Sequence, residues 1–231
     1  MTPDQMKRAA AEAVLPFVKS GMKLGLGTGS TARHFVDCVG DLVKQGYDLV
    51  CVPTSEETRK QAEGLGIPLT TLDKEQILDL TVDGADELDD KLNLIKGGGG
   101  ALLREKIVAS SSRQMIVIAD ASKHVKTLGA FPLPIEVVRF GARATAFKIE
   151  RCFTHLKMKG AMTVRVRDGK AFVTDNGNFI IDCALGEIPD PAKLQSYLAG
   201  IPGVVDHGLF VGLAKMAFLG TPKGVVTISH E

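Results

Sequence analysis

Short apolar runs alternate with amphipathic segments along the first 130 residues of the chain. Apolar runs bounded by turn residues are typical of buried strands, whereas apolar positions spaced three and four apart are typical of helices. The pattern predicts strands at residues 22–26, 49–52, 77–82 and 114–119. It predicts helices at residues 3–19, 32–43, 54–64 and 101–110, with capping boxes that begin at Thr2 and Thr54. This alternation favours a parallel sheet covered by helices.

The pattern changes after Phe131, where Pro132 and Pro134 mark a boundary. Strands are predicted at residues 135–138, 162–166, 171–174 and 179–183, and helices at residues 142–157 and 191–198. Asp168-Gly169 is typical of a tight hairpin between the second and third of these strands. We expect the glycine-punctuated tail, residues 208–229, to rejoin the first part of the chain.

These elements predict an α/β protein in two parts. The larger part is a Rossmann-like parallel-sheet domain, formed by residues 1–130 together with residues 207–231. The smaller part is an α+β lobe of ferredoxin-like type, formed by residues 131–206.

Composition narrows the functions that this fold can serve. The chain has 231 residues, of which 45% are apolar and 24% charged, values typical of a globular protein. A formal net charge of +1 does not favour nucleic-acid or membrane binding, so an anion must be bound by a local pocket. The four cysteines form no CxxC pair and no zinc-type cluster, so we expect reduced, buried thiols and no metal. Without a charged-then-apolar leader, we expect a soluble, cytoplasmic protein.

The first candidate site segment is the glycine turn at residues 25–32. Ser30 and Thr31 stand at a helix start, where free N–H groups favour an anion, so a phosphate site competes with an ordinary strand-to-helix turn. Gly27, Gly29 and Ala32 also fit a dinucleotide pattern. That pattern requires an acid at the next strand end, whereas no carboxylate follows there until Glu56.

The second candidate segment, residues 83–87, places Asp83 and Asp86 at the end of a buried strand, where carboxylates suit sugar hydroxyls. The alternative is a solvated acidic turn, which we favour for Asp89 and Asp90.

The third candidate segment consists of Lys96, four consecutive glycines and a helix. Four glycines cost much chain entropy when they become ordered, so we expect backbone that approaches a ligand rather than a linker. Glu105 shares a helix face with Leu102 and Ala109 and competes with the alternative of an exposed, paired acid. Lys123 follows the next strand, although a loop lysine is the default interpretation.

Together these segments resemble the type A ribose-5-phosphate isomerase family. The matching segments are residues 27–32, 83–87, 96–106, 120–123, 174–178 and 207–210, in the order that the family has them. The resemblance implies an enzyme that interconverts D-ribose 5-phosphate and D-ribulose 5-phosphate in the non-oxidative branch of the pentose phosphate pathway. It also implies a homo-oligomer, usually a dimer whose contacts we assign to the small lobe, with no metal or organic cofactor.

The resemblance further implies roles for particular residues. Glu105 would be the proton-transferring base, Lys96 would stabilise the enediolate, and Asp83 and Asp86 would position hydroxyl groups or assist ring opening. The residues expected to bind the substrate are Thr28, Gly29, Ser30, Thr31, Asp83, Gly84, Ala85, Asp86, Lys96, Gly97, Gly98, Gly99 and Lys123, with Lys7 as a weaker candidate for the phosphate.

Two functions of other classes stay open at this point. A non-catalytic sugar-phosphate sensor could have a related fold, but it should lack the base at Glu105 and would need a DNA-binding extension. A nicotinamide-dependent dehydrogenase is disfavoured by the missing acid at the second strand end.

We predict that activity on ribose 5-phosphate survives exhaustive chelation, because no His or Cys group in the sequence has metal-ligand spacing. The measurement is ketose formation before and after treatment with EDTA and removal of the chelate. Activity that disappears with EDTA and returns with a divalent ion would contradict the prediction.

Overall fold

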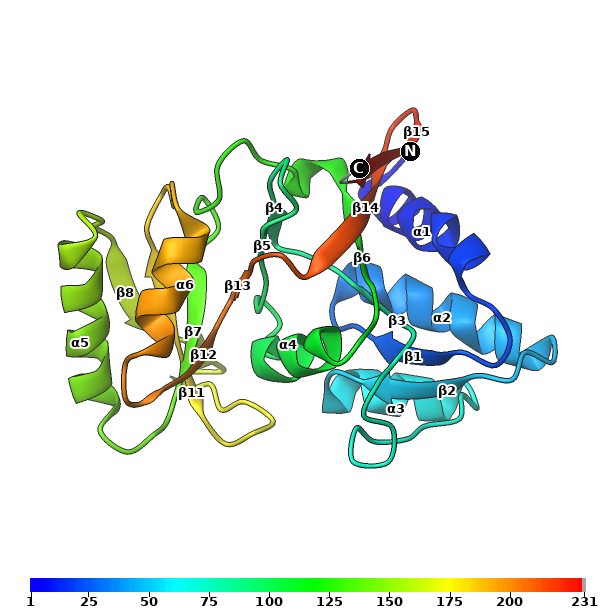
Figure 1. Ribbon diagram of the computed structural model, residues 1–231, viewed down its shortest axis with the longest axis horizontal. Helices are drawn as coiled ribbons and strands as arrows, with labels where there is room; N and C mark the ends of the chain where they lie inside the picture. The colour runs from blue at the N-terminus through cyan, green and yellow to red at the C-terminus, as the bar shows by residue number, and fades with distance from the viewer. Residues whose placement is uncertain (230–231) are drawn as a thin grey trace.

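A computed structural model describes residues 1–229, which form two lobes side by side (Figure 1). The large lobe contains a six-stranded sheet in the order β15-β14-β6-β3-β1-β2. Its strands are β1 (Lys23–Leu26), β2 (Val50–Pro53), β3 (Leu80–Asp83), β6 (Met115–Asp120), β14 (Ala214–Thr221) and β15 (Gly224–Ser229). All neighbours pair in parallel except β14 and β15, which form an antiparallel hairpin. The predicted α/β, Rossmann-like sheet is therefore confirmed.

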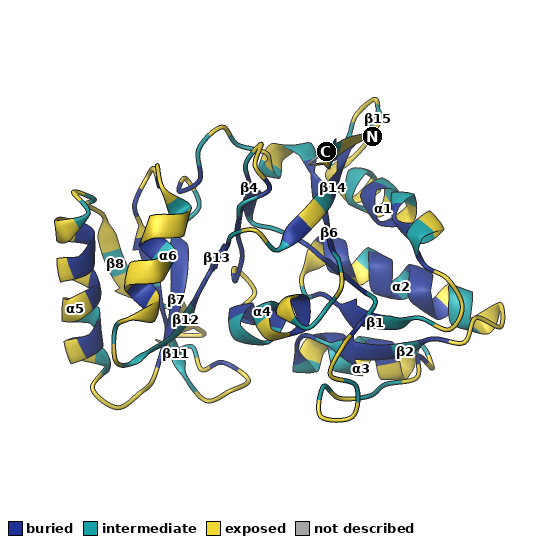
Figure 2. Cartoon of the chain, in the orientation of Figure 1, coloured by how far each residue is buried: buried dark blue, intermediate teal, exposed yellow. Residues whose placement is uncertain are grey.

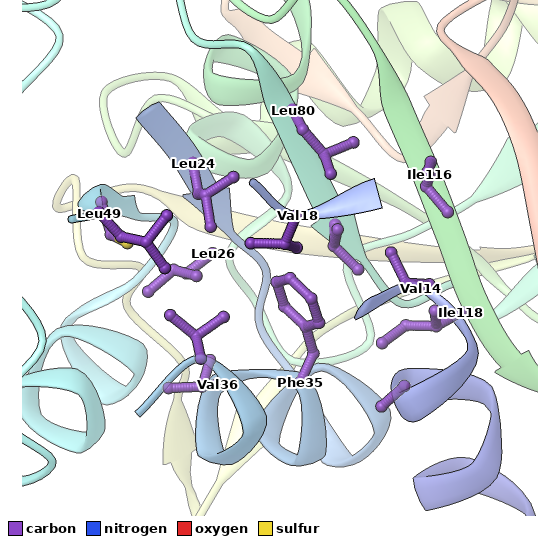
Figure 3. Close-up of a cluster of buried hydrophobic side chains, with 14 of the residues drawn as sticks. Val14, Val18, Leu24, Leu26, Phe35, Val36, Leu49, Leu80, Ile116 and Ile118 are labelled. Atoms are coloured by element: carbon purple, nitrogen blue, oxygen red, sulfur yellow. The ribbon is translucent and has the colours of Figure 1, made fainter. Parts of the chain in front are cut away.

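The central strands of this sheet are buried on both faces, and alternate residues enter different cores. On β6, Ile116 and Ile118 pack into one core, whereas Met115 and Val117 pack into the other. The first core lies under helices α1 (Pro3–Ala13), α2 (Ser30–Lys44) and α3 (Glu56–Gly64). Figure 3 shows its centre, where Phe35 of α2 points toward the strands. The opposite face carries α4 (Leu102–Ser110).

The small lobe has the strand–helix–strand–strand–helix–strand order of a ferredoxin-like unit. Its antiparallel sheet has the order β12-β7-β11-β8. The elements are β7 (Leu133–Val137), α5 (Ala142–His155), β8 (Ala161–Val164), β11 (Phe179–Ala184), α6 (Pro191–Ala199) and β12 (Val204–His207). The outer faces of α5 and α6 are largely exposed (Figure 2). The predicted hairpin is present, because β9 (Val166–Arg167) and β10 (Lys170–Ala171) pair across Asp168-Gly169.

Short elements connect the two lobes beside the strand ends of the large sheet. A three-stranded sheet of order β13-β5-β4 joins β4 (Glu87–Leu88), β5 (Leu94–Ile95) and β13 (Leu209–Phe210). The remaining short elements are the 3₁₀ turns η1 (Leu15–Phe17) and η2 (Ala121–Lys123). No helix within residues 1–229 combines the length and apolar character needed to cross a bilayer.

Three local predictions were wrong. The first helix ends at Ala13 rather than residue 19, because Pro16 has no N–H for a helical hydrogen bond and the chain tightens into η1. The cap of α3 is Ser55 rather than Thr54, since the Ser55 hydroxyl accepts from Thr58 N at 3.1 Å. The strand predicted from residue 77 begins only at Leu80, and Ile77 is exposed.

The predicted strands around the hairpin were also too long. The run at residues 162–166 breaks at Arg165, and of the strand predicted for residues 171–174 only Ala171 is in a strand, as the second residue of β10. The positions in these segments are mostly exposed, so little apolar burial favours longer strands.

Candidate active site

Three strand ends that are neighbours in the large sheet form the floor of one cavity. The first two strands end beside the glycine turn and at Asp83, and the third leads into η2 with Lys123. Because parallel strands present their carboxyl ends at the same edge, these three segments meet. The cavity is lined by Lys7, Thr28, Gly29, Ser30, Thr31, Gly84, Ala85, Asp86, Lys96, Gly97, Gly98, Gly99, Glu105 and Lys123. Thus the structure brings together all the candidate substrate residues except Asp83, which is fully buried and is not among the residues that line the cavity.

The turn after β1 leaves a set of free N–H groups at the start of α2. Gly29 precedes the helix at a φ of 114°, which favours glycine, and no side chain caps the helix. The N–H groups of Ser30 and Thr31 therefore have no partner within residues 1–229. Lys7 Nζ donates to Ser30 Oγ at 2.9 Å, which adds a cation beside the helix start. Helix N–H groups and an ammonium group in one place can bind an anion such as phosphate.

Thr28 is held from two sides, and its anchoring was not predicted. Its N–H donates to Asp83 Oδ1 at 3.1 Å. Its hydroxyl lies 2.7 Å from Thr54 Oγ1, 2.8 Å from Ser55 Oγ and 3.1 Å from Thr58 Oγ1. The run of hydroxyl residues at the end of β2 was the available signal, but its pairing with Thr28 depends on the fold. This network fixes the turn against the floor of the cavity.

A buried ammonium group lies between two buried carboxylates at the centre of the site. Lys96 Nζ is 3.1 Å from Asp83 Oδ2 and 3.3 Å from Glu105 Oε1. The same nitrogen donates to Gly84 O at 2.7 Å, and the side chain is only 2% exposed. Contact between Lys96 and Glu105 was not predicted, because the two residues belong to different local elements.

Burial and neighbouring charge shift the proton affinities of this cluster. Burial raises the pKa of Glu105 to about 8, and the Lys96 ammonium limits that rise. Burial also raises the pKa of Asp83, again opposed by Lys96. Burial lowers the pKa of Lys96, but the attraction of Asp83 and Glu105 outweighs it, so the net shift is upward and the lysine stays charged. The cluster thus combines a permanent cation with a carboxyl group that can exchange a proton near neutral pH.

Glu105 keeps one oxygen available. Its Oε2 is buried and has no hydrogen-bond partner within the described part of the chain, whereas Oε1 lies at Lys96. The other charged side chains of α4 are bound elsewhere, because Arg104 pairs with Glu56 at 3.0 Å and Lys106 pairs with Asp206 at 2.5 Å. The alternative of an exposed, paired acid at position 105 is therefore wrong.

Three of the four consecutive glycines, Gly97, Gly98 and Gly99, line the cavity. We call residues 97–100 the glycine loop. Gly97 has a φ of 108°, and a Cβ there would lie 2.9 Å from Leu102 Cβ. Gly98 N donates to Asp86 Oδ2 at 2.7 Å, so the loop also fixes the second aspartate. The prediction that this backbone closely approaches a ligand site, rather than acting as a linker, is consistent with that geometry.

Other acidic residues take structural roles. Asp89 Oδ1 accepts from Lys91 N and Asn93 N within its own loop, in agreement with the solvated acidic turn that we favoured there. Glu56 binds Arg59 at 2.7 Å and Arg104 at 3.0 Å, so its carboxylate is already paired with cations. Within residues 1–229, no group of three or more His, Cys, Asp or Glu side chains is placed to bind a metal ion.

Known proteins of a single family match this chain over most or all of its length. The family model of ribose 5-phosphate isomerase A (phosphoriboisomerase A) matches residues 50–224. A ribose-5-phosphate isomerase A of Parvibaculum lavamentivorans is 62% identical over 225 residues, which cover 97% of either chain. A protein of the same name from Nitrobacter hamburgensis is 59% identical over 232 residues and covers 100% of both chains.

Solved structures agree with the sequence relatives. The ribose 5-phosphate isomerase of Plasmodium falciparum is 42% identical, has a TM-score of 0.94 and covers 99% of each chain. A D-ribose-5-phosphate isomerase in complex with phospho-erythronic acid is 38% identical, has a TM-score of 0.93 and covers 100% of each chain. The same architecture therefore recurs over the full length of these proteins.

We predict that the Glu105 carboxyl titrates near pH 8 and that Lys96→Met raises its pKa further, because the ammonium that favours the carboxylate is removed. The measurement is the carboxyl ¹³C shift of labelled glutamate, followed by NMR across the titration. Lys106→Met is the matched control, since its ammonium pairs with Asp206, and it should leave the Glu105 titration unchanged. A Glu105 pKa near the ordinary glutamate value in the wild type would contradict this account.

Proposed function

We propose, because the chain belongs to the ribose 5-phosphate isomerase A family, that the cavity at the strand ends is its active site and Glu105 its base. The protein is an isomerase that interconverts ribose 5-phosphate and ribulose 5-phosphate. The observation that carries the site proposal is the buried Glu105 beside Lys96 in the wall of that cavity. No finding supports the alternative of a non-catalytic sugar-phosphate sensor.

The reaction passes through an enediolate and moves one proton from C2 to C1 and one hydroxyl proton from O2 to O1 of the sugar phosphate. Glu105 in its carboxylate form removes the proton from C2 of the aldose and returns it at C1. Negative charge develops on the carbonyl oxygen during removal, and a preorganised cation stabilises that charge. Lys96 supplies this cation, supported by the backbone N–H of Gly99 in the glycine loop. A base with a pKa near 8 suits proton transfer at neutral pH better than an ordinary glutamate does.

The phosphate and the hydroxyl groups orient the substrate over Glu105. The N–H groups and hydroxyls of Ser30 and Thr31, together with Lys7 and Lys123, form the proposed phosphate site. Asp86 faces the cavity and is available to position hydroxyls or assist opening of the furanose ring. Asp83 acts from beneath by holding Thr28 and Lys96. Remote binding of the phosphate thereby contributes orientation to the reacting carbon atoms.

We also keep the proposed division of the chain. Residues 1–130 with residues 207–231, of which 230 and 231 lie outside the described residues, form the catalytic domain, and residues 131–206 form the small lobe. In support, the cavity is lined only by residues of the first group.

We propose a cytoplasmic location as well, supported by four free, buried cysteines that suit a reducing compartment. Cell fractionation measures that location, and activity restricted to a membrane or secreted fraction would contradict it.

We predict that Glu105→Gln binds substrate nearly normally but lowers kcat at least about a hundredfold, because shape is kept and the base is lost. Glu105→Asp should retain part of the activity, since its carboxylate is withdrawn by one methylene group. The measurements are steady-state kinetics and deuterium incorporation from solvent into the product.

The matched control is Glu63→Gln, which removes an exposed carboxylate of α3 and should leave kcat unchanged. A Glu105→Gln enzyme that isomerises and exchanges at the wild-type rate would assign the base elsewhere, with Asp83 and Asp86 as the remaining carboxylates of the site.

We predict that Lys123→Ala mainly raises KM for ribose 5-phosphate, with some loss of kcat because the phosphate also orients the substrate. The control Lys126→Ala removes an exposed lysine three residues further along and should have wild-type kinetics. Equal turnover of ribose and ribose 5-phosphate by the wild type would show that no phosphate site contributes.

We predict a homodimer that is held by the small lobe. Seven of the thirteen exposed large hydrophobic residues lie within residues 131–206, among them Phe140 at 93% and Phe147 at 59% exposure. Contact between subunits would bury such exposed apolar side chains. Light scattering after gel filtration should give a dimer for the wild type and a lower mass for Phe140→Ser with Phe147→Ser. A monomeric wild type would contradict the prediction, and Ile77→Ser on the large lobe is the control.

A further inference from the structure

An arginine of the small lobe contacts the glycine loop of the large lobe. Arg165 lies between β8 and β9, and its side chain is 13% exposed. Its Nη1 donates to Gly97 O at 2.7 Å and to Gly98 O at 3.2 Å. These are two consecutive carbonyl groups of the loop that lines the cavity. A half-buried guanidinium group of the small lobe therefore holds the loop through two of its carbonyl groups.

The guanidinium group is itself held in place. Asp182 on β11 accepts Arg165 Nε at 2.9 Å and Nη2 at 2.5 Å, which makes a bidentate pair. The backbone of Arg165 is fixed on both sides, because its N–H donates to Ile180 O and its carbonyl accepts from Phe172 N, both at 2.8 Å. The side chain thus has one orientation in which three of its nitrogens are bonded. A lysine at this position could not make this set of contacts.

Because the peptide unit is planar, the contact of Arg165 with these two carbonyl groups also determines where the N–H groups of the same peptide units point. In a trans peptide the C=O and the N–H of one unit point in opposite directions, and the described backbone has no cis peptides. Arg165 therefore directs the N–H groups of Gly98 and Gly99 away from the guanidinium. Gly98 N donates to Asp86 Oδ2 at 2.7 Å, in agreement with that geometry. The N–H of Gly99 lacks an acceptor within residues 1–229, and Gly99 lines the cavity.

We propose that Arg165, held by Asp182, is a positioning residue that orients the glycine loop so that the N–H of Gly99 is presented to the oxygen that gains charge. This inference rests on the proposed function of the cavity. The two hydrogen bonds limit the freedom of four consecutive glycines, which would otherwise sample many conformations. A charged donor on each carbonyl also polarises its peptide, and this strengthens the N–H on the other side as a donor.

A purely structural bridge between the lobes is the alternative, and the two roles predict different kinetics. If Arg165 positions the loop, its substitution weakens the stabilisation of the enediolate, so kcat falls while KM changes little. The substitution then also weakens binding of phospho-erythronic acid, whose carboxylate carries charge where the enediolate does. If Arg165 has a purely structural role, its substitution lowers the melting temperature, while the folded enzyme keeps its kcat and its affinity for the acid.

The experiment compares Arg165→Met, Arg165→Lys and Asp182→Asn with the wild type in kinetics, phospho-erythronic acid inhibition and thermal unfolding. Arg165→Met should lower kcat about tenfold to a hundredfold, the range expected when reacting groups are misplaced by a fraction of an ångström to one ångström. Its inhibition constant for the acid should rise by a similar factor. Arg165→Lys and Asp182→Asn should show a smaller decrease in kcat and a smaller rise in the inhibition constant.

A double variant tests whether Asp182 acts through Arg165. Arg165→Met with Asp182→Asn should be no slower than Arg165→Met alone, because the aspartate has nothing left to hold. Lys170→Met is the matched control, since it removes an exposed cation from the β9–β10 hairpin and should leave all three measurements unchanged.

Wild-type kcat and inhibition in Arg165→Met, at any melting temperature, would overturn the proposal. If Arg165→Met does not fold, the same result in both Arg165→Lys and Asp182→Asn would overturn it. Failure of the proposed function looks different, because then Glu105→Gln would keep its activity whatever the Arg165 variants do.

Discussion

The site depends on the ion pairs of one buried ammonium group with two buried carboxylates. Lys96 lies within 3.3 Å of carboxylate oxygens from Asp83 and Glu105, and all three side chains are almost fully buried. Removing one partner from a buried ion pair typically costs about 3–5 kcal/mol, because an uncompensated charge remains. The fold therefore has to bring the end of β3, the residue after β5 and the first turn of α4 together. The Phe210 ring, 5.5 Å from Lys96 Nζ, covers this cluster from β13.

The backbone around this cluster is as closely fixed as the charges. Lys96 N donates to Gly208 O at 2.9 Å, and a Cβ on Gly208 would lie 2.2 Å from Lys96 O. A Cβ on Gly27 would likewise lie 2.2 Å from Asp83 Oδ1. Glycine at these positions serves close packing of the chain against the ion cluster. The small lobe contributes through Arg165, which donates to Gly97 O, whereas the side chains that line the cavity come from the large lobe.

The fold could be predicted from the sequence wherever local pattern decides structure. Apolar runs such as Met115 to Ala119 are buried on both faces in a parallel sheet, so they could be recognised as buried strands without knowledge of distant residues. The candidate cavity could be predicted because its segments follow strand ends. The contact of Arg165 with Gly97, 68 residues apart in sequence, could not, because no local pattern records which lobe surface a side chain reaches. The pairing of Glu105 with Lys96, nine residues apart, escaped prediction because it depends on how the glycine loop turns between β5 and α4.

The surroundings of the three carboxylates give each of them a different task. Asp83 Oδ1 accepts the N–H groups of Thr28 and Gly84, and Oδ2 forms an ion pair with Lys96 at 3.1 Å, but Asp83 does not line the cavity. Asp86 faces the cavity but accepts Gly98 N, which ties it to the glycine loop. Glu105 alone combines a place in the cavity wall, a raised pKa and an oxygen without a partner among the described residues. Proton transfer needs all three properties in one group, and this supports Glu105 as the base.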